Sequence, residues 1–102
     1  MSKNFRGYGD DGVLVPVTAA SATTPLHTNP NMARAAQDVL VDNRGTADAY
    51  IRVGDDTVSA STLCVRVPAG AVLAFSKGQF THIAAITASG TTSLVVHLGE
   101  GQ

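Results

Sequence analysis

The sequence has little charge, few aromatic residues and a single cysteine. Charged residues make up 15% of its 102 residues and aromatic residues 5%, and there is no tryptophan. Soluble domains usually carry about 25% charged residues, so we expect part of this surface to be covered in the working state. The lone Cys64 excludes an intrachain disulfide, and therefore a disulfide-stapled scaffold. Its apolar neighbours favour a small buried side chain over a reactive thiol.

The chain also lacks a basic cluster and a long apolar run. Its formal net charge is −1, its pI is about 6.2, and its seven Lys and Arg residues are scattered. Nucleic-acid-binding modules concentrate basic residues and have a high pI, and a membrane helix needs about 20 apolar residues. We therefore expect no nucleic-acid partner and no membrane partner. No signal peptide is visible, so we expect the chain to fold in a cytoplasm.

What is present is a series of short apolar segments in residues 39–102. Turn residues separate them at intervals of roughly 8–12 residues, as in β-sandwiches and small barrels. The expected strands are 39–41, 49–53, 62–67, 71–75, 80–87 and 91–98. The length fits one domain. The pattern predicts an all-β fold, a small β-sandwich that is jelly-roll-like.

Residues 1–38 differ in composition and predict an extended N-terminal arm. Pro16 cannot donate a backbone hydrogen bond, so 13–17 is an edge strand at best. Residues 20–33 are rich in Thr, Pro and Asn and predict a loop, and 32–36 predicts one helical turn. The arm would anchor on a partner through Phe5, Tyr8, Val13, Leu14, Val15 and Leu26. The alternative is that 13–17 completes the chain's own sandwich, and the pattern leaves both open.

The last two expected strands predict a hairpin around Ser89–Gly90. In that register Ile83 faces Val96 and Ala85 faces Leu94 on a core side. The other side is also apolar and predicts an oligomer or partner face made of His82, Ala84, Ile86, Val95 and His97. Small sandwiches are marginal alone and their exposed edges invite pairing. We therefore expect a homo-oligomer, a trimer or a dimer.

The sequence offers no convincing catalytic or metal site. His82 and His97 are expected to be neighbours, but zinc needs three or four protein ligands and no third one is close in sequence. His27 lies in the Pro-rich segment. The acidic pairs at 10–11 and 55–56 adjoin glycine, which favours turns over calcium binding. No Gly-x-Ser-x-Gly motif occurs. We expect no enzyme, no metal and no cofactor.

The C-terminal part carries a resemblance. It runs over 41–45 (VDNRG), 49–54 (AYIRVG), 67–70 (VPAG), 80–92 (FTHIAAITASGTT), 94–96 (LVV) and 99–101 (GEG). The span that holds these segments, about 60 residues, resembles small virion proteins of tailed bacteriophages, and HIAAITASGTT with the terminal GEG is the most specific part. The resemblance implies a jelly-roll-like sandwich that assembles on a particle, and it transfers no catalytic or ligand residue.

The expected function is capsid decoration. The chain would cement the capsid by binding between major capsid protein subunits. It would be located on the virion surface after assembly in the host cytoplasm. Two alternatives stay open: a tail or head–tail accessory protein, and a receptor- or glycan-binding module of a tail tip. The second is limited by the small supply of surface aromatic residues, Tyr8 and Tyr50.

Overall fold

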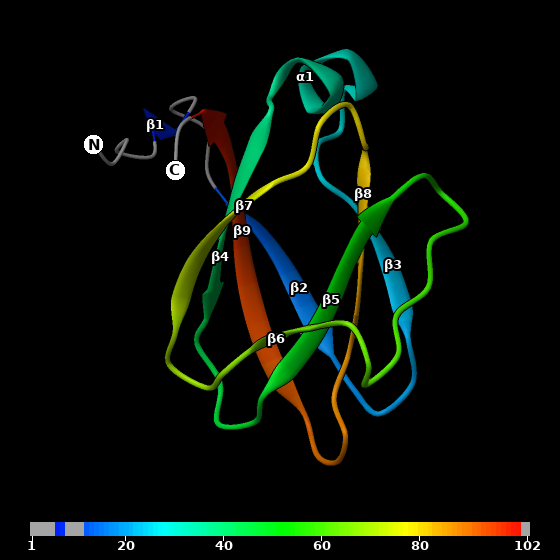
Figure 1. The fold of residues 1–102 in the computed structure, drawn as a ribbon, viewed down its shortest axis with the longest axis vertical. Coiled ribbons are helices and arrows are strands. Elements are labelled where there is room, and N and C mark those ends of the chain that lie inside the picture. Colours follow the sequence, from blue (N-terminus) through cyan, green and yellow to red (C-terminus); the bar gives the residue numbers. More distant parts are fainter. Residues whose placement is uncertain (1–5, 8–11, 101–102) are drawn as a thin grey trace.

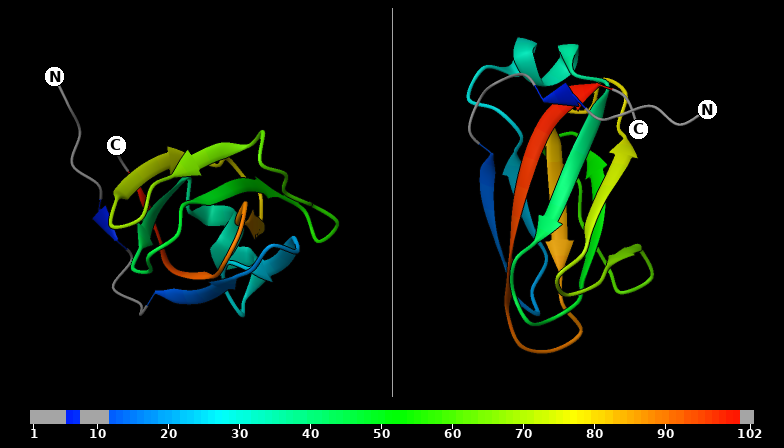
Figure 2. Two further views of the ribbon diagram at one scale, coloured as in Figure 1. Left: turned by 90° about the horizontal axis from the view of Figure 1, so that it is seen from below. Right: turned by 90° about the vertical axis from the view of Figure 1, so that its left-hand side faces the viewer.

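The computed structural model describes residues 6–7 and 12–100, and these form two antiparallel sheets packed face to face (Figure 1). Sheet A has the order β2 (Val13–Val17), β9 (Thr92–Glu100), β4 (Asp38–Asn43) and β7 (Val72–Ser76), and β1 (Arg6–Gly7) also pairs with β9. Sheet B has the order β3 (Ala22–Pro25), β8 (His82–Ile86), β5 (Ala49–Gly54) and β6 (Val65–Val67). Figure 2 shows the two layers from two further sides.

The connections make this sandwich a jelly roll. Strands β2, β4, β7 and β9 belong to one sheet, while β3, β5, β6 and β8 belong to the other, so most connections cross between sheets. Eight strands in two such sheets define the jelly roll. The predicted fold class is therefore confirmed, and the six strands expected between 39 and 98 all exist with shifted ends.

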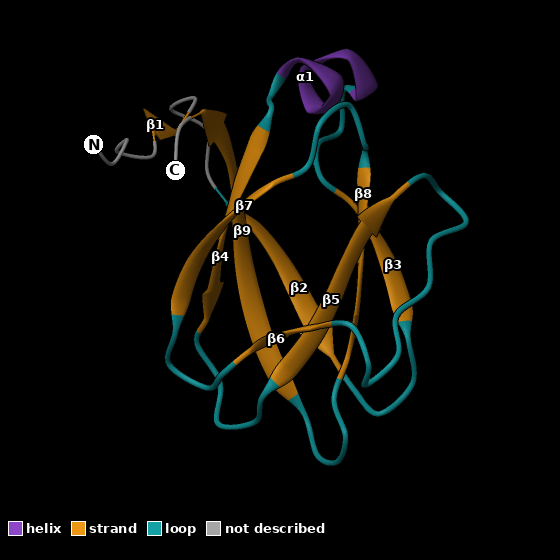
Figure 3. Cartoon of the chain, in the orientation of Figure 1, coloured by secondary structure: helices purple, strands orange, loops and turns teal. Residues whose placement is uncertain are grey.

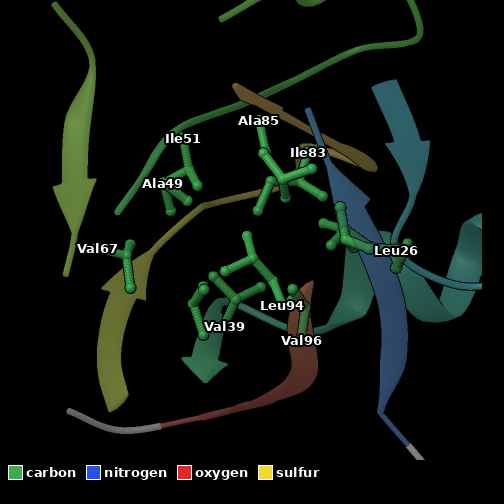
Figure 4. Packing of buried hydrophobic residues seen from close by; sticks show 13 residues of the cluster. Leu26, Val39, Ala49, Ile51, Val67, Ile83, Ala85, Leu94 and Val96 are labelled. Atoms are coloured by element: carbon green, nitrogen blue, oxygen red, sulfur yellow. The ribbon is translucent and has the colours of Figure 1, made fainter. Parts of the chain in front are cut away.

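The core lies between the sheets and is built from small aliphatic side chains (Figure 4). Alternate residues of each strand point inward, as with Val39 and Val41 of β4 and Ile83 and Ala85 of β8. Asn43 is fully buried and joins the sheets at one end. Its side-chain nitrogen donates to the carbonyl oxygens of Ala47 (3.0 Å) and Val67 (2.9 Å), and its oxygen accepts from the Thr92 hydroxyl (2.6 Å).

The one helix of the described residues, α1 (Pro30–Ala35), covers the opposite end of the sandwich (Figure 3). Asn29 caps its start, because its side-chain oxygen accepts from the Asn31 backbone nitrogen at 3.0 Å. Lys77 is 3% exposed, and its ammonium group donates to the carbonyl oxygens of Ala33 and Ala36 at the helix end. Burial lowers the pKa of Lys77, and the charge of Asp38 partly opposes this shift.

Of the two alternatives that the sequence left open, the structure shows the second: 13–17 completes the chain's own sandwich, and residues 12–38 are not an extended arm. Strand β2 pairs with β9 from Val13 to Val17, and β3 occupies part of the segment expected to be a loop. The prolines limit these strands to sheet edges, as Pro16 predicted, but do not prevent them. Val15 and Leu26 are each 1% exposed in the core, so they anchor this chain's own sandwich. Phe5 and Tyr8 lie outside the described residues.

The expected hairpin of the last two strands is also wrong. Strand β8 pairs with β3 and β5 in sheet B, whereas β9 pairs with β2 and β4 in sheet A. Ile83, Ala85, Leu94 and Val96 do share the core, but they face one another between the sheets and are not paired by backbone hydrogen bonds. His82 and His97 are consequently on different sheets.

Candidate functional site

The structure does not bring the candidate chemical groups together. His27 accepts a hydrogen bond from the Asn29 nitrogen at 2.9 Å in its own loop, His82 contacts Thr81 at 2.7 Å, and His97 lies on sheet A. No group of three or more His, Cys, Asp or Glu side chains that could hold a metal ion occurs in the part of the chain that the structure describes. Asp55 accepts from the Thr57 hydroxyl (2.5 Å) and nitrogen (2.8 Å) in a local turn. These bonds lower the pKa of Asp55, and they agree with the turn expected there.

The predicted partner face is divided between the two sheets. Val95 and His97 lie on the outside of sheet A, while His82, Ala84 and Ile86 lie on the outside of sheet B. These two outer surfaces face opposite directions, because the sheets pack through their inner sides. The five residues therefore do not form one surface, and each sheet needs its own description.

The outer side of sheet A is apolar. Register places Leu14, Val95, Asp42 and Val72 in one row across β2, β9, β4 and β7, and His97, Leu40 and Ala74 in the next. Leu14 is 63% exposed and Val72 is 53% exposed. We call this surface the sheet A face; it consists of Leu14, Leu40, Val72, Ala74, Val95 and His97.

One ion pair interrupts the sheet A face. The guanidinium nitrogen Nε of Arg44 lies 2.7 Å from an Asp42 carboxylate oxygen, so the charge in the apolar row is paired. Gly12 also lies against this face. A Cβ atom at Gly12 would come within 2.4 Å of the Val95 side chain and 2.8 Å of His97, so only glycine lets the chain lie so closely there.

A loop of the same chain, residues 55–64, lies over part of the outer side of sheet B. The Val58 carbonyl oxygen accepts from the Thr23 hydroxyl of β3 at 2.6 Å, and a Cβ atom at Gly54 of β5 would meet the Val58 side chain at 2.7 Å. Since β8 lies between β3 and β5, the loop crosses β8. Ala84 of β8 points to this side and is completely buried. Figure 1 shows the loop passing β3 on its way to β6.

Cys64 lies at the end of this covering loop and is partly exposed. Partial burial raises the pKa of its thiol, but hydrogen bonds from Ser61 and the nearby Arg52 guanidinium outweigh that effect, so the pKa is lowered overall. The Ser61 backbone nitrogen lies 3.4 Å from the Cys64 sulfur. The sequence predicted a buried and inert thiol, and its local hydrogen bonds were missed.

A shallow polar pocket of about 460 Å³ lies at the end of the sandwich opposite α1. Its lining consists of Thr46, Ala47, Asp48, Tyr50, Ala88 and Ser89. Asp48 accepts a hydrogen bond from the Ala69 backbone nitrogen at 2.9 Å, and Arg66 lies 3.9 Å from its other oxygen. Tyr50 was noted in the sequence as a possible surface aromatic, but the pocket combines two loops that are far apart in the chain.

Comparisons with known proteins give fold likeness only. No family model matches the chain, and no curated protein matches its sequence. A cupin-2 domain containing protein from Shewanella frigidimarina is similar at 14% identity and a TM-score of 0.47, over 97% of this chain and 80% of that one. A Bacillus endospore appendage protein from disulfide-linked pili is similar at 15% identity and a TM-score of 0.48, over 99% and 91%.

An enzyme is among the similar structures. Hydroxypropylphosphonic acid epoxidase from S. wedmorenis is 15% identical with a TM-score of 0.47, over 83% of this chain and 41% of the epoxidase. The chain thus spans about two fifths of that enzyme's length. At these identities the likenesses concern the fold class alone.

Among the described residues, the helix does not have the length and apolar character needed to span a membrane.

Proposed function

We propose that this chain is a non-catalytic structural protein that decorates and stabilises the capsid of a tailed bacteriophage by binding between major capsid protein subunits. The observation that carries the proposal is the sheet A face, which is largely apolar, exposed at Leu14 and Val72 and partly exposed between them. The core is closed without this surface, so folding does not explain its apolar character. Contiguous exposed apolar patches on soluble domains mark interaction sites. The resemblance of residues 41–101 to small virion proteins suggests the class of partner.

The shape of the sheet A face suits attachment to a particle. It extends across four strands, with Leu14 on one edge strand and Val72 on the other. The Asp42–Arg44 pair within it already satisfies its charges, so covering the face leaves no unpaired ion. A contact of this kind is weak singly, but linked copies on a lattice gain avidity. Oligomers of this chain, dimers or trimers, would bind in that way.

The test uses expanded capsid shells that lack this protein. Purified chain is mixed with the shells, and bound copies are counted after sedimentation. We expect saturation at a copy number set by the lattice, and at least about a tenfold weaker affinity for the double variant Leu14→Lys and Val72→Lys, because docking would have to desolvate two added charges. The matched control is Leu63→Lys, whose leucine is 95% exposed on the loop over sheet B.

The outcomes separate the candidate locations. Wild-type chain that ignores shells but enters isolated tails would contradict the capsid proposal and favour the tail or head–tail alternative. Equal shell binding by the double variant and the wild type would exclude the sheet A face as the docking surface. Loss of binding by the control alone would assign docking to the other side of the sandwich.

The polar pocket beside Tyr50 favours glycan binding as a second candidate function. An aromatic ring next to a carboxylate and hydroxyl groups is a suitable arrangement for a sugar, and pockets hold ligands through a few placed polar groups. Titration with glucose, galactose and N-acetylglucosamine, followed by NMR chemical shifts, tests it. The candidate requires shifts at Tyr50 and Ser89 that the variant Tyr50→Ala abolishes. Absence of any shift at millimolar sugar removes it.

A further inference from the structure

Three of the edge strands, β2, β3 and β6, carry a feature that opposes further pairing. Strand β2 contains Pro16 and β3 ends at Pro25, and proline cannot donate to a neighbouring strand. Strand β6 has only three residues, with Arg66 at its centre. Proteins protect edges in these ways, with proline, charge or short length. Strand β7 differs: its five residues, VLAFS, include no proline and no charge.

The backbone of β7 presents hydrogen-bonding groups on its outer side. The Asn43 nitrogen donates to the Ala71 carbonyl oxygen at 2.9 Å, and the Lys77 nitrogen donates to Gln37 at 2.8 Å. Residues 71 and 77 therefore direct backbone groups toward the β4 side. In an antiparallel ladder this direction alternates along the strand. The backbone groups of Val72 and Ala74 consequently point away from β4, toward the edge.

The side chains around this edge are apolar on both sides of the sheet. Val72 and Ala74 lie on the sheet A face, and Leu73, which is 37% exposed, lies on the core side beside Phe75. A pocket of about 130 Å³ lies between β7 and sheet B, lined by Ile51, Arg52, Val53, Val65, Phe75 and Ser76. Val65 on the neighbouring β6 is 54% exposed. Figure 2 shows β6 and β7 along the same side of the sandwich.

We propose that β7 pairs with β7 of a second copy of this chain, antiparallel and about a twofold axis at Ala74. The two Ala74 residues then exchange backbone hydrogen bonds, and sheet A continues across the dimer. The register sets Leu73 of each copy opposite Phe75 of the other, beside the pocket that Phe75 lines. The proposal does not depend on the capsid proposal, since it rests on the backbone groups at the edge of sheet A and not on what covers the sheet A face, although Val72 and Ala74 belong to both.

A second copy fits this edge better than an unrelated strand. A partner needs an uncharged apolar edge strand, and in the described chain β7 is an edge strand without proline or charge whose Val72 and Ala74 backbone groups point away from β4. A twofold contact is self-complementary, so one strand supplies both halves. The formal net charge of −1 gives two copies little mutual repulsion.

The test measures mass in solution by analytical ultracentrifugation of the full chain. We expect a wild-type dimer of twice 10.4 kDa. Ala74→Lys and Ala74→Glu each set like charges opposite each other at the axis, which destabilises a strand pair, so each variant should dissociate at least about tenfold more readily. Mixing the two variants should restore a one-to-one dimer, because lysine then faces glutamate. Leu14→Lys, on the opposite edge of sheet A, is the matched control and should remain dimeric.

Three results would overturn the proposal. They are a wild-type chain that stays monomeric up to about 1 mM, a dimer that neither variant weakens, and weakened variants whose mixture does not recover. Circular dichroism and thermal unfolding of each variant show whether it is folded. If Ala74→Lys fails to fold, Ala74→Glu and a Ser76→Lys variant test the same edge.

Discussion

The outer surfaces of the two sheets are built differently. Part of sheet B lies under the chain's own loop 55–64, which contacts Thr23 and Gly54, and the outward-pointing Ala84 is completely buried. Sheet A has a close contact with Gly12 at one place, while Leu14 and Val72 stay largely exposed. The outward-pointing Ala84 is thus a structural residue on sheet B, whereas Leu14 and Val72 are candidate binding residues on sheet A. The same alternation of strand residues serves stability on one sheet and docking on the other.

The largest expected difference in stability is between substitutions on the core side of sheet A and substitutions on its outer side. Leu94 is fully buried in the core, and Leu14 on the adjacent strand is 63% exposed. Replacing Leu94 with alanine should lower the free energy of unfolding by about 3 kcal/mol, the usual cost of a buried leucine with its cavity. Leu14→Ala should change it by less than about 0.5 kcal/mol. Urea unfolding of both variants measures the difference, and equal losses would mean that the sheet A face is structural.

A smaller difference in stability is expected between substitutions on the outer sides of the two sheets. Val58→Ala removes part of the cover of sheet B and should cost about 1 kcal/mol, because the valine is half-buried against Gly54. Val72→Ala on the sheet A face, 53% exposed, should cost less than about 0.5 kcal/mol. The comparison of unfolding midpoints checks this, since the same side chain is shortened in both cases. A larger loss for Val72→Ala would reverse the assignment of covered and exposed surfaces.

The positions of the strands could be predicted from the sequence, but their partners could not. Turn residues such as those at 42–45, 54–56 and 68–70 separate apolar segments, and that pattern is local. The segments 82–86 and 92–100 are adjacent in the chain and apolar on alternate residues, which agrees equally with a hairpin and with two strands that face each other across a core. Which of the two forms depends on strands from other parts of the chain. Strands β3 and β5 pair with the two edges of β8, and β2 and β4 pair with the two edges of β9, so β8 and β9 do not pair with each other.

The candidate surfaces were predictable to the extent that they depend on single strands. Leu14 and Val95 were both recognised as exposed candidates, one as an arm anchor and one as part of a partner face, and the register places them side by side. Leu26 and Val15 were misassigned because composition alone does not show that a Thr- and Pro-rich segment contributes edge strands. The cover over sheet B was not predictable, since Val58 and Thr23 are far apart in sequence.

The smallest expected effect concerns the thiol at the end of the covering loop. The lowered pKa of Cys64 means that its thiolate forms at lower pH than that of an ordinary cysteine, and the thiolate is the reactive form. Alkylation by iodoacetamide, followed from pH 6 to pH 10, should therefore show a midpoint below that of a free cysteine. Ser61→Ala removes the hydroxyl that lies 3.9 Å from the sulfur and should move the midpoint upward. Val72→Lys on the sheet A face is the control and should leave it unchanged. A midpoint equal to that of free cysteine would mean that the loop does not hold the Cys64 sulfur beside Ser61 and Arg52. The loop that distinguishes sheet B from sheet A would then be loosely held at this end.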